Sequence, residues 1–190
     1  MSRALDVALA SIGLVVSAPF LAVAVIAIRL GTPGPAIYRQ RRIGKDGRPF
    51  ELYKLRTMVQ GADPVGIGEA LRPDDPRITR VGALLRRLSL DEVPNLFNVV
   101  RGEMAIVGPR PTIEAQVKLY TPRQRRRLEV KPGMTGWAQV NGRTALPWDE
   151  RIELDVWYVE HRSLALDLRI LARTARLLLT WRWLYTGDAA

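Results

Sequence analysis

The sequence predicts an α+β protein with one N-terminal membrane helix, a small β-hairpin and several amphipathic helices. Three patterns carry this prediction. Residues 7–28 contain no charge, apolar and polar residues alternate on both sides of a turn at 44–47, and apolar residues recur at helical spacing in several later segments. The 190 residues, 47% of them hydrophobic, are enough for a packed core. We expect a membrane segment over 1–30 and one domain over 31–190.

The composition restricts the chemistry of the protein. There is no Cys and a single His, which excludes disulfides, thiolate zinc sites, cysteine nucleophiles and metal sites built from several histidines. A catalytic metal would be a hard cation bound by oxygen atoms, such as magnesium. The formal charge of +10, from 29 Lys+Arg against 19 Asp+Glu, implies an anionic partner. Nucleic acid, an anionic lipid surface and phosphorylated small molecules all fit this charge.

The uncharged segment 7–28 would form a helix about 33 Å long, enough to cross a bilayer core. It lacks a convincing cleavage site, so we expect it in the mature protein. Pro19 should bend this helix, and the Ser17 hydroxyl could donate to an upstream carbonyl at the bend. Two topologies stay open, a kinked spanning helix and a re-entrant hairpin that returns to its own side. Arginines at both flanks, including Arg3 and Arg29, agree with the second.

The remaining elements follow in order. The breaker cluster at 31–35 ends the apolar helix, and strands at 36–41 and 49–55 should form the hairpin. A loop is expected at 61–77, a helix at 81–88, and a second helix from Ser89 through residue 100. Residues 131–143 indicate turns and short strands, and 148–160 a helix.

The last predicted helix, over about 165–184, is amphipathic and basic. Arg169, Arg173 and Arg176 share one face, and apolar residues lie opposite. This face could pack on the protein core, or it could lie on a membrane surface with the aromatic residues 181, 183 and 185 at headgroup depth. Both interpretations stay open.

The segment around Asp91 is the most informative for chemistry. Ser89 and Glu92 have the spacing of a capping box, which places Asp91 in a first helical turn. A helix N-terminus and the nearby Arg86 would keep the Asp91 carboxylate ionised, as attack on phosphorus requires. Adjacent carboxylates also suit a magnesium ion that bridges enzyme and diphosphate. The alternative is that both residues only stabilise the helix end.

Other charged residues give weaker signals. Arg110 stands between two prolines, a stiff mount for a guanidinium that could bind phosphate or simply lie in a solvated turn. The common glycine-rich nucleotide loops are absent. His161 should make a local structural hydrogen bond, and the basic run 123–127 should be a solvated or headgroup-facing patch.

Four segments resemble, in order, the motifs of the bacterial sugar transferase family, the monotopic phosphoglycosyl transferases that start glycoconjugate assembly on polyprenyl phosphate. They are YRQRRIGKDGRPFELYKLRTM at 38–58, ITRVGALLRRLSLDEVPNLFNVVRGEMAIVGPRP at 78–111, KPGMTGWAQVNGR at 131–143 and LDVWYVEHRSLALDLRIL at 154–171. The match spans nearly the whole chain. We expect the minimal catalytic form of this family, without the extra membrane helices of its larger relatives.

The resemblance implies a fold and a reaction. The membrane helix would be a re-entrant hairpin broken at Ser17 and Pro19, with the catalytic domain on the cytoplasmic face of the bacterial inner membrane and amphipathic helices at the interface. The family's Asp-Glu pair falls on Asp91 and Glu92. Asp91 would attack the β-phosphate of a UDP-sugar, release UMP and carry a phosphosugar, which undecaprenyl phosphate then accepts. Glu92 would position the pair, help bind Mg²⁺ or assist the acceptor.

The resemblance also suggests substrate contacts and partners. The expected substrate-binding residues are Lys54, Arg56, Arg86 and Arg110 toward phosphates, with Gln139, Asn141 and Arg143 toward the nucleotide sugar. The partners would be the UDP-sugar, undecaprenyl phosphate and membrane phospholipids, with no nucleic acid. The rival hypothesis is a membrane-anchored basic adaptor for anionic lipid or nucleic acid. It is disfavoured by the low aromatic content of 7% and by the lack of a recognisable nucleic-acid module.

Overall fold

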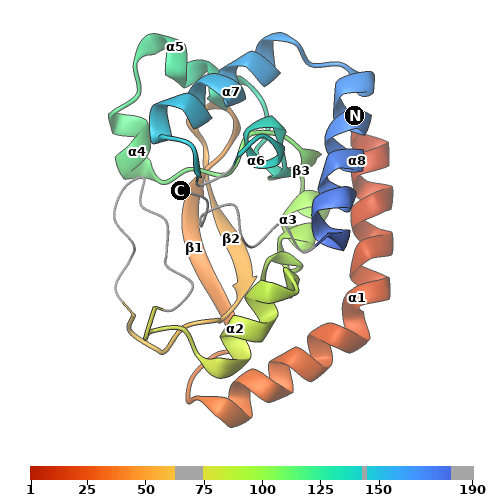
Figure 1. The fold of residues 1–190 in the computed structure, drawn as a ribbon, viewed down its shortest axis with the longest axis vertical. Coiled ribbons are helices and arrows are strands. Elements are labelled where there is room, and N and C mark those ends of the chain that lie inside the picture. Colours follow the sequence, from red (N-terminus) through yellow and green to blue (C-terminus); the bar gives the residue numbers. More distant parts are fainter. Residues whose placement is uncertain (63–74, 143–144, 181–190) are drawn as a thin grey trace.

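A computed structural model describes residues 1–62, 75–142 and 145–180 of the chain. The first element, α1 (Arg3–Gly31), is one continuous helix with Pro19 inside it. Figure 1 shows α1 bent near its middle, as the sequence predicts. The Ser17 hydroxyl donates to the carbonyl of Gly13 at 2.6 Å, which confirms the expected bond to an upstream carbonyl. Proline removes one helical hydrogen bond and crowds the preceding turn, and the helix bends there as a result.

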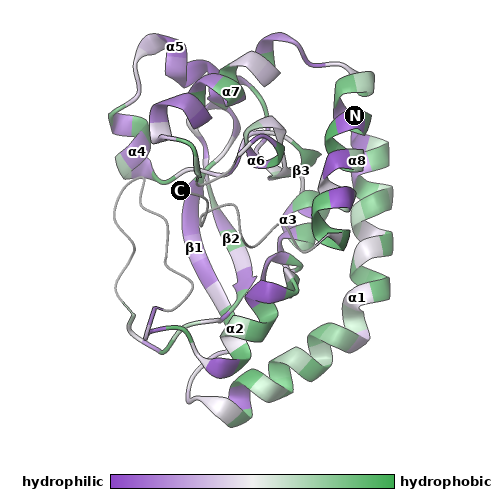
Figure 2. Cartoon of the chain, viewed as in Figure 1, coloured by the Kyte–Doolittle hydropathy of each residue, from purple (hydrophilic) through white to green (hydrophobic). Residues whose placement is uncertain are grey.

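The outward side of α1 is apolar (Figure 2). Ile12, Val15 and Leu30 are 62%, 75% and 84% exposed. By length and composition, α1 is the one helix among the described residues that could cross a membrane.

The predicted hairpin is confirmed. Strands β1 (Ile37–Ile43) and β2 (Pro49–Leu55) pair antiparallel, with Tyr38 opposite Lys54 and Arg42 opposite Phe50. A short 3-10 turn, η1 (Lys45–Gly47), joins them, with Asp46 and Gly47 at positive φ. Residues directly opposite in an antiparallel pair share a face, so Lys54 and Arg42 lie on the same side of the hairpin.

The next elements carry the chain across the hairpin and α1. The predicted helix at 81–88 is α2 (Arg80–Arg87). The predicted continuous helix from Ser89 is wrong, because a 3-10 turn η2 (Leu90–Glu92) and a separate helix α3 (Asn95–Arg101) take its place. Pro94 is the residue that precedes α3, where a missing N–H costs no helical hydrogen bond.

The second half of the chain contains a parallel pair of short strands, one of them within the predicted 131–143 segment and the other, like the pairing itself, not predicted. It consists of β3 (Ala105–Val107) and β4 (Gly133–Thr135). Between them lie α4 (Glu114–Lys118), α5 (Pro122–Arg125) and η3 (Arg126–Glu129), and α6 (Trp137–Val140) follows. The two predicted C-terminal helices are α7 (Trp148–Glu160) and α8 (Leu164–Leu179). The aromatic residues 181, 183 and 185 lie outside the described residues.

Two buried clusters attach both halves of α1 to the hairpin. In the first half, Ala10 packs with Leu52 of β2 and Val99 of α3. In the second half, Ala24 and Ile28 pack with Leu55 of β2 and Leu85 of α2. Small residues on the inner side of α1 permit this close approach, since a Cβ at Gly13 would lie 2.9 Å from the side chain of Leu96. The bent helix therefore packs against one body along both of its arms.

Candidate active site

The backbone before Asp91 is unusual. Thr79 caps α2 by accepting a hydrogen bond from Gly82 N at 2.9 Å, and α2 ends at Arg87. Ser89 then has φ 55° and ψ 20°, the left-handed region, which costs a non-glycine residue energy and is found often at functional sites. The predicted capping box is wrong, because Ser89 makes no capping hydrogen bond and the Glu92 side chain bonds Lys54 of β2. The turn at Ser89 presents Asp91 and Glu92 to the hairpin.

Glu92 is held between two cations. Its Oε1 accepts hydrogen bonds from Lys54 Nζ at 2.7 Å and from Arg110 at 2.8 Å. Burial alone would raise the pKa of Glu92, but the charges of Arg110 and Lys54 and their hydrogen bonds outweigh it and hold this pKa well below its ordinary value. Glu92 is therefore a fixed carboxylate that links β2 to the segment after β3.

Asp91 differs from its neighbour. Its carboxylate makes no hydrogen bond to another described residue. Burial, followed by the adjacent charge of Glu92, raises the pKa of Asp91, while Lys54, Arg86 and Arg110 act in the opposite direction. We expected the opposite direction from a helix N-terminus beside Arg86. A single 3-10 turn lacks the dipole of a helix, and the neighbouring carboxylate disfavours a second negative charge.

Four cations lie around the two carboxylates. The guanidinium of Arg86 donates from Nε to Thr57 Oγ1 at 2.8 Å, and Asp91 is the charge that most favours its ionised form. Sequence reasoning missed Arg42, which donates to the Gln40 side chain at 2.6 and 3.1 Å and to the Pro111 carbonyl at 3.0 Å. Burial and the charge of Arg110 lower the pKa of Arg42 to about 10. Arg42 lies two residues after Gln40 and four after Tyr38, the residue opposite Lys54, so it lies on the same face of the hairpin as Lys54. This alternation is the sequence signal that could have identified Arg42.

The mount of Arg110 is a buried network that sequence reasoning also missed. Arg127 donates to the carbonyl oxygen of Arg110 at 3.0 Å, to Asp155 Oδ2 at 2.5 Å and to the Tyr120 hydroxyl at 2.5 Å. Burial raises the pKa of Asp155 to about 6, against the lowering effect of Arg127. The expectation of a solvated patch at 123–127 is therefore wrong for Arg127, which is 7% exposed.

Two other arginines of the basic run at 123–127 form ion pairs at the surface. Arg123 contacts Glu153 at 2.9 Å, and Arg126 contacts Glu160 at 2.6 Å. His161 bonds the Trp157 carbonyl at 2.8 Å, which confirms its local structural role.

The remaining sequence-predicted site residues do not join the Asp91 cluster. Arg56 is buried and donates to the Thr32 carbonyl at 2.9 Å and to the Pro33 carbonyl, so it fastens the end of α1. Asn141 bonds the Trp137 carbonyl and Arg173 at 2.8 and 2.7 Å. Gln139 is 4% exposed, and its side-chain nitrogen and oxygen are both without partners among the described residues. Arg143 lies outside the described residues.

The donor set for a metal is limited. Within the described ranges no three His, Asp or Glu side chains gather to hold an ion. Among the described residues, Asp91 and Glu92 are the carboxylates available at this site, and Glu92 already contacts two cations. This set fits Mg²⁺, which commonly uses one or two carboxylates and takes its other ligands from phosphate oxygens and water. It does not suit a metal that needs an all-protein cage.

A carboxylate pair surrounded by Lys54, Arg86 and Arg110 offers a nucleophile together with cations that can bind phosphate oxygens. Comparison with known proteins agrees. The chain matches the family model of bacterial sugar transferases over residues 1–181, and it belongs to this family. It is a transferase.

Three relatives illustrate the family. The chain is 49% identical to an uncharacterized sugar transferase, EpsL, of Bacillus subtilis, over 81% of this chain and 74% of that protein. It is 44% identical to a UDP-glucose:undecaprenyl-phosphate glucose-1-phosphate transferase of Caulobacter vibrioides, over 94% and 69%. A protein of the same name from Escherichia coli is 40% identical, over 92% of this chain but only 39% of its own length.

Proposed function

We propose that this protein transfers a sugar 1-phosphate from a UDP-sugar to undecaprenyl phosphate, giving UMP and an undecaprenyl-diphosphate sugar. Two relatives that match over more than 90% of the chain carry the name of this reaction with UDP-glucose. A third, from Aeromonas hydrophila and 38% identical, is named for an N-acetylgalactosamine phosphate transfer. The common elements of these names, a UDP-sugar and undecaprenyl phosphate, are the substrates we assign.

The observation that carries the mechanism is the contrast between the two carboxylates. Glu92 is fixed by Lys54 and Arg110, whereas Asp91 has no hydrogen bond to a described residue and is free to react. In our proposal an ionised Asp91 oxygen attacks the β-phosphorus, and the bond from that phosphorus to the bridging oxygen breaks as UMP leaves. An undecaprenyl phosphate oxygen then attacks the same phosphorus and displaces Asp91, which regains its carboxylate.

The surrounding cations would stabilise the charge that moves during these steps. In this proposal Arg86 and Arg110 would contact phosphate oxygens, and Lys54 and Arg42 would raise the local positive potential. Glu92 would act as a positioning residue that keeps Lys54 and Arg110 aimed at the substrate. Magnesium bound by Asp91 and Glu92 with the diphosphate would neutralise charge that otherwise repels the nucleophile.

We further propose that α1 is re-entrant. Both of its ends are fastened to the same body, because Arg3 donates to the Val100 carbonyl of α3 at 2.7 Å and Arg56 donates to the Thr32 carbonyl. A straight helix of this length would be about 43 Å long and would put those ends on opposite sides of a bilayer. The bend at Pro19 instead lets the exposed apolar side enter the membrane and return. The catalytic body would then lie on the cytoplasmic face of the inner membrane, in contact with its phospholipids.

The experiment that tests the function is UMP release from a panel of UDP-sugars, with undecaprenyl phosphate and magnesium. We expect one donor or a small set to react, and we expect release to require both the lipid acceptor and Asp91. Asp91→Asn should abolish turnover without changing membrane association. Normal turnover by Asp91→Asn would overturn the covalent mechanism, and silence across the panel would overturn the choice of donors.

A further inference from the structure

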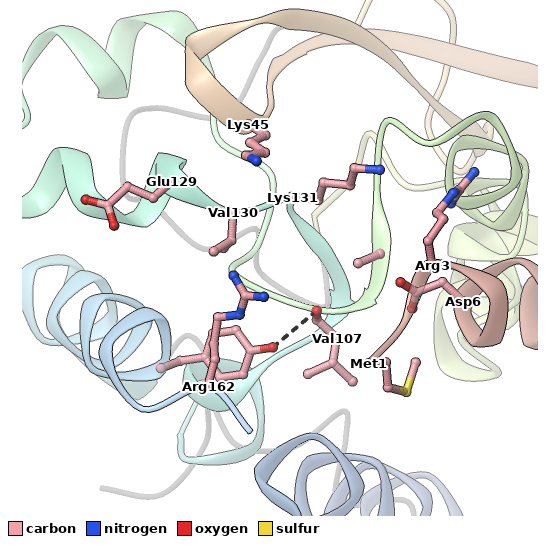
Figure 3. Close-up of a pocket in the computed structure, with 11 residues that line it drawn as sticks. Met1, Arg3, Asp6, Lys45, Val107, Glu129, Val130, Lys131 and Arg162 are labelled. Atoms are coloured by element: carbon pink, nitrogen blue, oxygen red, sulfur yellow. Dashed lines mark hydrogen bonds between the residues drawn. The ribbon is translucent and has the colours of Figure 1, made fainter. Parts of the chain in front are cut away.

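A cavity lies away from Asp91, at the start of α1. Its volume is about 210 Å³, and its walls come from the first turn of α1, the hairpin turn η1, β3, the segment before β4 and the loop after α7 (Figure 3). At about 30 Å³ for each water molecule in the liquid, this is room for a small phosphate ester. None of its lining residues belongs to the Asp91 cluster.

The charge of this cavity is positive. Lys45, Lys131 and Arg162 line it, and none of their side chains has a hydrogen bond or ion pair to another described residue. Burial lowers the pKa of Lys131, and the charges of Arg3 and Lys45 lower it further, while Asp6 opposes them. The local environment therefore disfavours another cation and favours an anion.

The acidic groups of the cavity are engaged elsewhere. Asp6 is buried and accepts a hydrogen bond from Ile106 N at 3.0 Å. Glu129 pairs with Arg126 at 3.3 Å, and Figure 3 shows its carboxylate pointing away from Lys131. The three unpaired cations are thus not neutralised by the carboxylates that line the same cavity.

The position of the cavity indicates which anion it meets. Arg3 lies in its wall, and the next exposed apolar side chains along α1 are Leu5, Leu9 and Ile12, at 38%, 39% and 62%. Polar groups at the end of an apolar helix lie at headgroup depth when the helix enters a bilayer, where cations meet lipid phosphates. The cavity would therefore open at the level of phospholipid headgroups. This step rests on our proposal that α1 enters the membrane.

We propose that this cavity binds the phosphate of an anionic phospholipid headgroup, with Lys45, Lys131 and Arg162 as its cationic contacts. Phosphate esters dissolved in water share this chemistry and are the alternative source. The lipid is favoured because the site lies at the water-facing end of the apolar helix. A bound lipid would fix the depth of α1 without contacting the reacting groups at Asp91.

The test is native mass spectrometry of the full chain released from detergent, titrated with phosphatidylglycerol or phosphatidylcholine. The double variant Lys45→Gln/Lys131→Gln is compared with the control Arg48→Gln/Arg125→Gln, which removes the same charge from exposed residues outside the cavity. We expect phosphatidylglycerol to bind the wild type and the control alike, and the cavity variant at least tenfold more weakly. Lys131→Arg, which keeps the charge, should retain binding.

The outcomes separate the sources of phosphate and separate this site from the transferase. Equal binding to both double variants would overturn the cavity proposal. Binding of glycerol 3-phosphate as tightly as phosphatidylglycerol, with loss in the cavity variant, would overturn the lipid assignment in favour of a soluble ester. Asp91→Asn should bind phosphatidylglycerol as the wild type does, because Asp91 does not line the cavity. The binding result can therefore be interpreted even if the proposed reaction is not observed.

Discussion

Replacing Glu92 by glutamine separates positioning from chemistry. Glutamine keeps an acceptor oxygen but loses the charge that Lys54 and Arg110 contact at 2.7 and 2.8 Å. A hydrogen bond to a charged group contributes roughly 1.5–3 kcal/mol, against about 1 kcal/mol for a neutral one. Lys54 and Arg110 are 18% and 46% exposed, which reduces the loss to about 1 kcal/mol for each contact. If Lys54 and Arg110 lose this positioning energy in the transition state, the total of about 2 kcal/mol corresponds to roughly 30-fold in kcat/KM.

The same substitution should move the pH dependence. Glu92 is the neighbouring charge that raises the pKa of Asp91, so its neutralisation lowers that pKa. Asp91 acts when ionised in our mechanism, and the acid limb of kcat/KM should therefore shift to lower pH. The assay is UMP release between about pH 5 and 8, with initial rates at low donor concentration.

The control and the refuting results follow from the same structure. Glu153→Gln removes a comparable ion pair, to Arg123 at 2.9 Å on the exposed surface, and should change kcat/KM less than about twofold. If Glu92→Gln falls to the level of Asp91→Asn, Glu92 takes part in the chemistry and the positioning role is wrong. A shift of the acid limb to higher pH would contradict the electrostatic reasoning.

Three further predictions concern stability and topology. The pKa of Asp155 is about 6 in the folded chain and about 3.9 when unfolded, so the folded state binds this proton more tightly. The stability of the wild type relative to Asp155→Asn should therefore fall as pH rises from about 4 to about 6, by thermal unfolding in detergent, and a flat or rising difference would contradict this. Arg56→Gln should lower the unfolding free energy by about 3 kcal/mol, because it loses charged hydrogen bonds to Thr32 at the end of α1. The KM for the donor should stay within about threefold. A raised KM at unchanged stability would instead make Arg56 a substrate contact. Single cysteines that replace Ser2 and Pro35 should both react with an impermeant maleimide from the cytoplasmic side only. Adding Pro19→Ala should make the cysteine of Ser2→Cys partly accessible from the opposite side. Unchanged labelling would mean that Pro19 does not determine the topology.

Local patterns were sufficient for the elements that depend on local physics. The missing N–H of Pro19 predicts the bend in α1, and an alternation with a period of two predicts the hairpin. A hydrophobic period of 3.6 residues predicts the helices α2 and α7. The charges of the motif around Asp91 identified it in the sequence, but its backbone conformation was not predicted. The left-handed Ser89 and the 3-10 turn after it go together with the contact of Glu92 with Lys54, which is distant in the sequence. The spacing of Ser89 and Glu92 alone suggested a capping box instead.

Contacts between distant segments account for the rest. The pair of Arg127 and Asp155 joins residues that are 28 positions apart, and the parallel pairing of β3 with β4 crosses a similar distance. A run of basic residues looks solvated in the sequence because nothing local marks one arginine as buried. Lys54 and Arg56 were both expected to contact phosphates, and their roles separate only in the fold, where Lys54 faces Glu92 and Arg56 faces the end of α1.

The most direct test of the central claim is the detection of a phosphosugar on Asp91. The full chain would be incubated with its UDP-sugar without acceptor, quenched, and analysed by intact mass and peptide mapping. We predict a mass increase of one sugar phosphate on the peptide that contains Asp91, its absence in Asp91→Asn, and its removal by undecaprenyl phosphate. UMP release that needs both substrates together, with no adduct at any stage, would contradict the account.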